Sequence, residues 1–206
     1  GPDSWEELEG ETVYTLARGA TPDVLFRYLL SQHGVDPESD LTIDYSYGHV
    51  ELAQLAASGQ VRLAVLPEPF VTQVTLRNPE MRVLIDFQES WKRVTESDTS
   101  YPQTLFVARR SVATENPAAF AALMEAIGES LRFALQDPKE TARLTSESEV
   151  GLPAPVTESA IPRLNIAYRS AVEARGAIEN YLRVLYEFNP RSVGGKVPDA
   201  SFYLEL

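Results

Sequence analysis

The chain has 206 residues, and its 18 Lys and Arg against 30 Asp and Glu give a formal net charge of −12 at pH 7. Apolar residues make up 44% of the sequence and charged residues 23%, which predicts a folded core in one large or two small domains. An acidic surface excludes nucleic acid as a partner, because phosphate binding depends on clustered Lys and Arg. The absence of cysteine excludes disulfides, thiolate zinc sites, cysteine-held iron–sulfur clusters and a cysteine nucleophile.

The first half of the sequence alternates strand-like runs with helical patterns, as is typical of β-α units around a parallel sheet. Strands are predicted at 12–16, 41–45, 61–66 and 82–87, and helices at 22–34, 49–58 and 70–78. Thr21 is the predicted N-cap of the first helix, Pro22 its first residue and Gly34 its end. The run 61–66 is almost continuously apolar, which favours a central strand buried on both faces.

The second half is mostly helical after the polar segment 88–102. The predicted elements are a strand at 104–108, a long helix opened by Asn116 and Pro117, a short helix ending near Leu144, and a long helix at 169–188. A link at 151–155, a turn at 194–196 and a strand-like run at 202–204 complete the pattern. The sequence contains neither a run of about 18 apolar residues that would span a membrane nor a signal-peptide pattern.

The sequence shows no catalytic constellation. It lacks a nucleophile elbow, a dinucleotide-binding loop and a P-loop, and neither histidine belongs to a metal-binding cluster. His33 is interpreted as a surface residue at a helix C-terminus. His49 lies at a strand-to-helix junction, where it either lines a ligand site or is an ordinary turn residue. A binding function that needs no cofactor and no metal is therefore expected, rather than an enzyme.

Three strand-to-helix junctions are the candidate ligand-binding positions. The loop formed by Gly19, Ala20 and Thr21 offers backbone N–H groups and a hydroxyl at the positive end of a helix, which suits a carboxylate, sulfonate or phosphate. The alternative is a capped helix with nothing bound. The other junctions lie at 47–49 and 67–70. Because parallel strands end at one edge of a sheet, all three are expected to border one crevice.

A series of short segments occurs in the order found in one known family. The segments are 8–13, 19–22, 34–36, 59–61, 66–70, 101–108, 116–117 and 194–199. Over nearly the whole chain they resemble the solute-binding proteins of ABC transporters in the nitrate, sulfonate and taurine (SsuA/TauA-like) group, which includes binders of thiamine pyrimidine precursors.

The resemblance implies an α/β fold of the type II periplasmic binding protein kind, a three-layer αβα sandwich. It places residues 8–100 in the second lobe, with the ligand crevice, and residues 101–206 in a mostly helical segment that returns to the first lobe. The opening part of the first lobe is then expected to be missing. The helices around 120–135 and 178–188 would expose apolar faces, so self-association or a rearranged packing is expected.

The function implied by the resemblance is capture of a small anionic or heterocyclic solute, such as a sulfonate, nitrate or pyrimidine-type compound, and its delivery to the membrane subunits of an ABC permease. The implied ligand-binding residues are Gly19, Ala20 and Thr21 at the helix N-terminus, Tyr47 and His49 as crevice walls, Glu68 after the third strand, and Tyr101 near the hinge. Glu68 either accepts from the solute or favours the dipole of its own helix.

The location implied by the resemblance is the periplasm or the extracellular face. Any lipid anchor would be attached through a removed N-terminus, because the sequence has no cysteine. Two alternative functions are weighed against solute capture. The same fold can serve as a ligand-sensing or partner-binding module, and a related pyrimidine-synthesis enzyme would need a cysteine-rich iron site that this sequence cannot supply.

Overall fold

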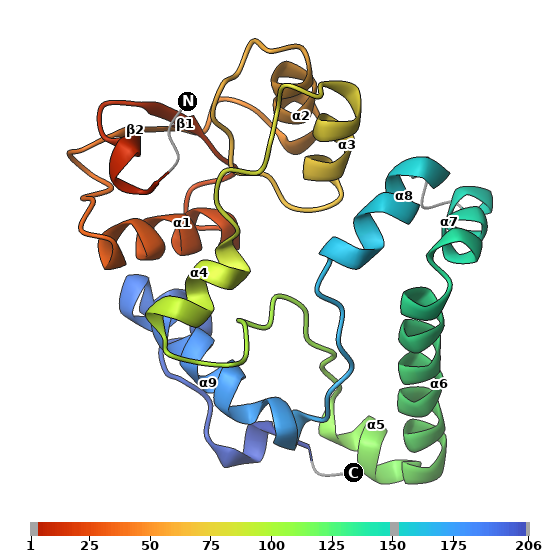
Figure 1. Cartoon of the computed structure of the whole chain (residues 1–206). Helices are drawn as coiled ribbons and strands as arrows, with labels where there is room; N and C mark the ends of the chain where they lie inside the picture. Colours follow the sequence, from red (N-terminus) through yellow and green to blue (C-terminus); the bar gives the residue numbers. More distant parts are fainter. Residues whose placement is uncertain (1–3, 149–152, 205–206) are drawn as a thin grey trace. The chain divides into compact units, whose positions relative to one another are not determined.

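The computed structural model describes residues 4–148 and 153–204, which divide into two compact units (Figure 1). Unit 1 is Gly1–Pro102 with Gly176–Asp199, and unit 2 is Gln103–Arg175 with Ala200–Leu206. The chain therefore passes from one unit to the other directly after Pro102, directly after Arg175 and directly after Asp199. The assignment of residues 8–100 and 101–206 to two lobes stays a prediction.

The sheet of unit 1 is small and parallel. Strands β1 (Thr12–Tyr14) and β2 (Thr42–Asp44) pair with Val13 opposite Ile43. On the other side of β1, the Tyr14 N–H donates to Leu63 O and the Val65 N–H donates to Tyr14 O. This segment forms a single parallel bridge, at Ala64, instead of the predicted strand.

The prediction that residues 61–66 are buried on both faces was wrong. Val61 is buried, but Arg62 is exposed and residues 63–66 are only partly buried. Within the described ranges no strand pairs with the outer edge of this segment. In the predicted strand at 82–87, residues 82–86 are irregular and Phe87 begins a helix. An extended segment needs a hydrogen-bonded neighbour to become a strand, and here only β1 supplies one.

Five helices contribute to unit 1. They are α1 (Thr21–Gln32), α2 (His49–Ala57), α3 (Phe70–Arg77), α4 (Phe87–Val94) and the part of α9 (Ala171–Phe188) that follows Arg175, with the short 3₁₀ helices η1 (Glu6–Leu8) and η3 (Pro190–Val193). Helix α4 was not predicted. The Asp86 side chain accepts hydrogen bonds from the N–H groups of Gln88 and Glu89, so this aspartate caps a helix within the polar segment.

Helix α1 forms the centre of the unit 1 core. Its residues Phe26, Leu29 and Leu30 pack in one cluster with Val13 of β1 and Trp5 near the N-terminus. Gly34 follows the helix with φ of 80°, in the left-handed region that favours glycine, which confirms the predicted end. The predicted start is corrected by one position, because Ala20 is the N-cap and Thr21 is the first helical residue. Helices α2 and α3 pack side by side and cover Leu66 (Figure 1).

Unit 2 is helical. It contains α5 (Arg110–Glu115), α6 (Pro117–Gln136), α7 (Pro138–Glu147), α8 (Ala154–Ala160), the start of α9, and the 3₁₀ helices η2 (Ile161–Arg163) and η4 (Ala200–Phe202). The predicted cap at Asn116 is confirmed, because its side chain accepts from the Ala119 N–H. In the predicted link at 151–155, residues 151 and 152 lie outside the described residues, and residues 154 and 155 begin α8, which was not predicted.

Three predictions for unit 2 were wrong. Residues 104–108 are irregular and exposed rather than a strand, and a 3₁₀ helix ends within the predicted strand-like run 202–204. Val172 of α9 is exposed, although its place in the apolar period predicts an inward position. The exposure of Leu123 and Leu135 of α6, in contrast, agrees with the expectation that the helix around 120–135 exposes an apolar face. An apolar stripe becomes a buried face only when another element covers it. Among the described residues, no helix is both long enough and apolar enough to span a bilayer.

Candidate functional site

The candidate site lies where the parallel segments of unit 1 end. β1, β2 and the segment at 63–65 run in the same direction, and each is followed by a loop that opens α1, α2 or α3. Parallel strands place these three loops at one edge of the sheet, as the sequence predicted. The predicted residues Thr21, Tyr47, His49 and Glu68 therefore come from three loops or helix starts at this carboxyl edge.

Ring contacts hold the second and third junctions. The Tyr47 ring lies 5.5 Å from the Tyr14 ring at the end of β1, measured between centroids. The His49 ring lies 5.7 Å from the ring of Phe70, the first residue of α3. His49 is exposed and Tyr47 is partly buried. Both side chains thus remain open to a ligand on one side while a neighbouring ring fixes the other.

Glu68 has a structural role at the third junction. Its carboxylate accepts a hydrogen bond of 3.0 Å from the backbone N–H of Thr72, in the first turn of α3. An acidic group at this position also favours the helix dipole. Glu68 therefore stabilises the start of α3, which was the structural alternative that its sequence position left open.

A buried ionic cluster joins the first junction to the second, and the sequence interpretation missed it. Asp23 is 0% exposed, and its Oδ1 accepts from Arg27 Nε at 2.8 Å and from the Tyr45 hydroxyl at 2.6 Å. The Arg27 guanidinium also donates to Glu38 and, at 2.7 Å, to the Tyr45 oxygen. This cluster fixes the loop after β2 against α1. The sequence did contain a signal for this cluster, because an Asp and an Arg lie four residues apart on an otherwise apolar face of the predicted helix.

The same carboxylate occupies the predicted anion loop. Asp23 Oδ2 accepts a hydrogen bond of 2.6 Å from the backbone N–H of Gly19. Gly19 has φ of 81°, so a residue with a side chain would be strained in this conformation. The chain's own carboxylate thus satisfies one of the donors that the sequence had assigned to a solute.

The hydrogen bonds of this cluster shift the pKa values of Arg27 and Tyr45. Burial alone would lower the pKa of Arg27, but the hydrogen bonds with Tyr45 and Asp23 outweigh it and raise the pKa. Burial and then the Asp23 hydrogen bond raise the pKa of the Tyr45 phenol. Arg18, which the sequence interpretation did not consider, stacks over the Tyr45 ring at 5.4 Å and adds an exposed positive charge beside Gly19.

An aromatic cluster supports Thr21 from the other side. The Tyr181 hydroxyl of α9 donates to Thr21 Oγ1 at 3.2 Å. The Tyr181 ring stacks on the Tyr101 ring at 5.7 Å and meets the Trp91 ring edge-on at 6.1 Å. Burial raises the pKa of the Tyr101 phenol well above its usual value. Tyr101 is buried, so it reaches the candidate site through Tyr181 rather than at an exposed surface.

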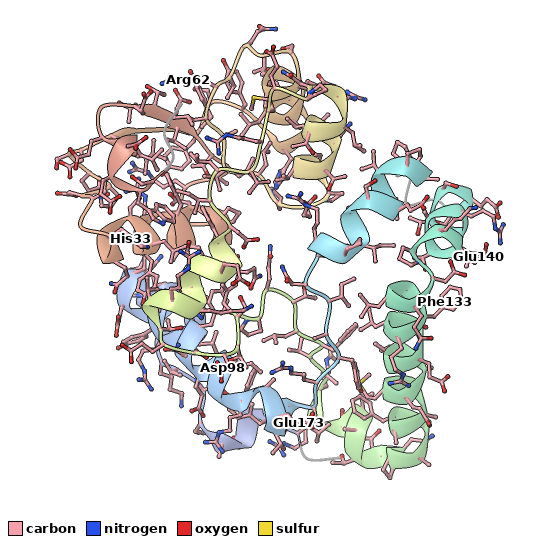
Figure 2. The ribbon with its side chains drawn as sticks, viewed as in Figure 1. His33, Arg62, Asp98, Phe133, Glu140 and Glu173 are labelled. Atoms are coloured by element: carbon pink, nitrogen blue, oxygen red, sulfur yellow. The ribbon has the colours of Figure 1, made fainter. Side chains whose placement is uncertain are left out.

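His33 lies away from the junctions, at the C-terminal end of α1 (Figure 2). It is partly buried, and its ring stacks on Trp5 at 5.3 Å with an interplanar angle of 13°. The expected surface position is therefore corrected. Across residues 4–148 and 153–204, no group of three or more His, Cys, Asp or Glu side chains could hold a metal ion.

Known proteins are similar to this chain in sequence and in fold. Residues 2–148 match the family model described as "ABC transporter, phosphonate, periplasmic substrate-binding protein". The Bacillus subtilis (strain 168) protein YtlA, which is named as a binding protein, is 25% identical over 112 residues, corresponding to 54% of this chain and 31% of YtlA.

The solved structures that are similar to this chain include the following three. An ABC transporter protein from Parabacteroides distasonis is 27% identical with a TM-score of 0.76, and the match covers 96% of this chain and 66% of that one. The aliphatic sulphonate binding protein SsuA of Escherichia coli is 20% identical with a TM-score of 0.72, covering 100% and 62%. The alkanesulfonate-binding SsuA of Xanthomonas axonopodis pv. citri, bound to MOPS, is 16% identical with a TM-score of 0.61, covering 96% and 62%.

These likenesses confirm the predicted α/β periplasmic-binding-protein fold. The chain spans less than two thirds of the length of each of these relatives. The family model, in contrast, matches well over half of the chain itself. The chain therefore belongs to the family of periplasmic substrate-binding proteins of ABC transporters.

Proposed function

We propose that the protein containing this chain is the solute-binding component of an ABC importer, which captures a small solute and delivers it to permease subunits in the membrane. The observation that carries the proposal is the meeting of three loops at the carboxyl edge of the unit 1 sheet, in a chain of the substrate-binding family. This edge is where open α/β sheets bind ligands. The family description supports a periplasmic location, and we propose a lipid anchor as one way of holding the protein at the membrane.

The proposed solute carries an oxyanion. The family description names phosphonate, and the two SsuA relatives are named for sulfonates. Both groups present three oxygens around phosphorus or sulfur. Arg18 beside the first junction and the N–H groups at the start of α1 favour such a group locally, against the overall charge of −12. Nitrate and pyrimidine-type compounds are the other solute classes to be compared.

The predicted site residues take different parts in this proposal. Thr21, Tyr47 and His49 contact the solute. Gly19 and Ala20 shape the loop that precedes Thr21, and Glu68 holds the start of α3. Tyr101 supports Thr21 through the ring of Tyr181.

We propose binding without chemistry on the solute. The relatives' names describe transport and binding proteins, and the described carboxylates at the junctions already serve the fold, as Asp23 and Glu68 show. A ligand-sensing module of the same fold would also bind the solute, but it would not stimulate transport by a permease.

A thermal-shift screen of the full-length protein tests the proposed function. We expect methanesulfonate or methylphosphonate to raise the melting temperature, since a ligand at 100 times its Kd stabilises the folded state by about 2.7 kcal/mol. Nitrate, acetate and an aminopyrimidine are the comparison compounds. Thr21→Val should reduce the shift, whereas the matched variant Thr42→Val, on the exposed side of β2, should keep it. A screen in which no compound shifts the melting temperature contradicts solute capture.

We also propose that this 206-residue chain self-associates through unit 2. Several large apolar side chains of unit 2 are exposed, and Phe133 of α6 is one of them (Figure 2). Phe106 is 64% and Val107 76% exposed, and Leu123 of α6 is 52% exposed. Exposed large apolar side chains of this kind mark association sites when they lie together on a surface. Light scattering should give a mass above 22.8 kDa that falls in Phe106→Ser/Leu123→Ser, and a strict monomer would contradict the proposal.

A further inference from the structure

We propose that Tyr181 is a positioning residue of the solute site, which orients the Thr21 hydroxyl as a hydrogen-bond donor toward the solute. This inference rests on the proposed function. It adds a residue from α9, which the sequence interpretation did not connect with the site, and it states to which chemical group of the solute Thr21 donates a hydrogen bond. The argument depends on the geometry of two hydroxyls and on the rings behind them.

The aromatic cluster fixes the position of the Tyr181 phenol. Tyr181 is 6% exposed, and its ring is held between Tyr101, at 5.7 Å, and Trp91, at 6.1 Å. Buried rings in offset or edge-on contact have few alternative rotamers. Burial also raises the pKa of the phenol and outweighs the opposite effect of its hydrogen bond with Thr21, so the group stays protonated near neutral pH.

The direction of the hydrogen bond determines what Thr21 can offer. The Tyr181 hydroxyl donates to Thr21 Oγ1 over 3.2 Å, so the phenol proton fills an acceptor site of the threonine. A threonine hydroxyl has one proton and two lone pairs. Among the described residues, none accepts the Thr21 hydroxyl proton. The Ala17 carbonyl, four residues earlier, accepts the N–H of Ala20 instead.

The neighbouring backbone donor is already paired. The Gly19 N–H donates to Asp23 Oδ2 at 2.6 Å, so the chain's own carboxylate already occupies that hydrogen-bond donor. Thr21 is only partly buried at the first position of α1. Its hydroxyl is therefore the oriented side-chain donor of this junction. It suits a solute oxygen that accepts a hydrogen bond, such as an oxygen of a sulfonate or phosphonate.

The test compares single-atom changes by calorimetric titration of the full-length protein with methanesulfonate and methylphosphonate. Tyr181→Phe keeps the ring and removes the donor, and we expect it to weaken binding roughly fivefold, the loss of about one ordinary hydrogen bond. Thr21→Val should weaken binding at least about tenfold, because a hydrogen bond to a charged group is stronger. Thr21→Ser keeps the hydroxyl that Thr21→Val removes, and it should therefore bind nearly as well as the wild type. Tyr28→Phe, which also packs on Trp91, is the matched control and should bind as the wild type does.

The double variant separates positioning from packing. In the Thr21→Val background, Tyr181→Phe should cause no further loss of affinity, because its effect passes through the Thr21 hydroxyl. Additive losses, or unchanged affinity in Tyr181→Phe, would overturn the role of Tyr181 and leave the proposed function standing. Failure of the wild type to bind either probe would overturn the proposed function, and this inference with it.

Discussion

Asp23→Asn should destabilise unit 1 by about 3–5 kcal/mol, because it removes one partner of a buried ion pair and leaves the other charged. Asp23 is 0% and Arg27 4% exposed, so water cannot replace the lost carboxylate. Asparagine keeps the volume of the side chain, which excludes a cavity as the cause. Its amide group would also face the donors of Arg27, Tyr45 and Gly19 with only one oxygen.

Urea denaturation followed by tryptophan fluorescence measures this loss in unit 1. The two tryptophans of the sequence, Trp5 and Trp91, both lie in unit 1. Asp23→Leu/Arg27→Met, which removes the whole pair, should recover much of the stability, because apolar replacement of a buried pair is often neutral. Glu89→Gln breaks an exposed pair with Lys92 on α4 and should leave the midpoint unchanged. An Asp23→Asn midpoint equal to that of the wild type would show that the cluster does not stabilise the fold.

Trp91→Ala should cost a similar amount, about 3–5 kcal/mol, through loss of packing rather than charge. Trp91 is 2% exposed, and its ring contacts those of Tyr28, Tyr101 and Tyr181, which belong to α1, the segment after α4, and α9. Removing the indole leaves a cavity among three elements that cannot close without moving the others. Because Tyr181 rests on this ring, Trp91→Ala should also weaken solute binding.

Circular dichroism in urea is the measurement for this variant, with the fluorescence of Trp5 as a second signal from unit 1. Trp91→Phe keeps an aromatic ring and should lose distinctly less stability. Leu76→Ala on α3 is the control for loss of apolar volume at the surface, since Leu76 is 53% exposed, and it should change stability by no more than about 0.5 kcal/mol. Equal losses for Trp91→Ala and Leu76→Ala would contradict the central position of Trp91.

Helix boundaries were predictable wherever the signal lies within one turn of the chain. Pro22 and Gly34 bracket α1, and Asn116 with Pro117 opens α6, within one or two residues of the predicted positions. Asp86 carried the same kind of signal for α4, but the surrounding segment is polar and buries mainly Trp91, so the apolar pattern gave no indication of a helix.

Strands and buried faces were less predictable, because they depend on distant neighbours. Residues 82–87 and 104–108 have strand-like composition, yet in the described part of the chain no partner strand lies beside them. The exposed positions Leu123 and Leu135 follow the apolar period of α6 just as Phe120 does, but Phe120 alone of the three is buried. Composition and period state which side chains can be buried, and the covering element decides which of them are.

The sequence by itself determined the family, the α/β class and the presence of three strand-to-helix junctions, at which we propose that a ligand binds. It could do so because β-α units and helix starts are encoded by residues close together in the chain. Only the tertiary structure decided which hydrogen bonds the residues at those junctions form with the rest of the chain. Asp23 pairs with Gly19 and Tyr45, and Tyr181 reaches Thr21 across 160 positions of sequence. No local pattern specifies a hydrogen bond over that distance. It exists because the packing of α1, α4 and α9 around Trp91 brings the two hydroxyls together.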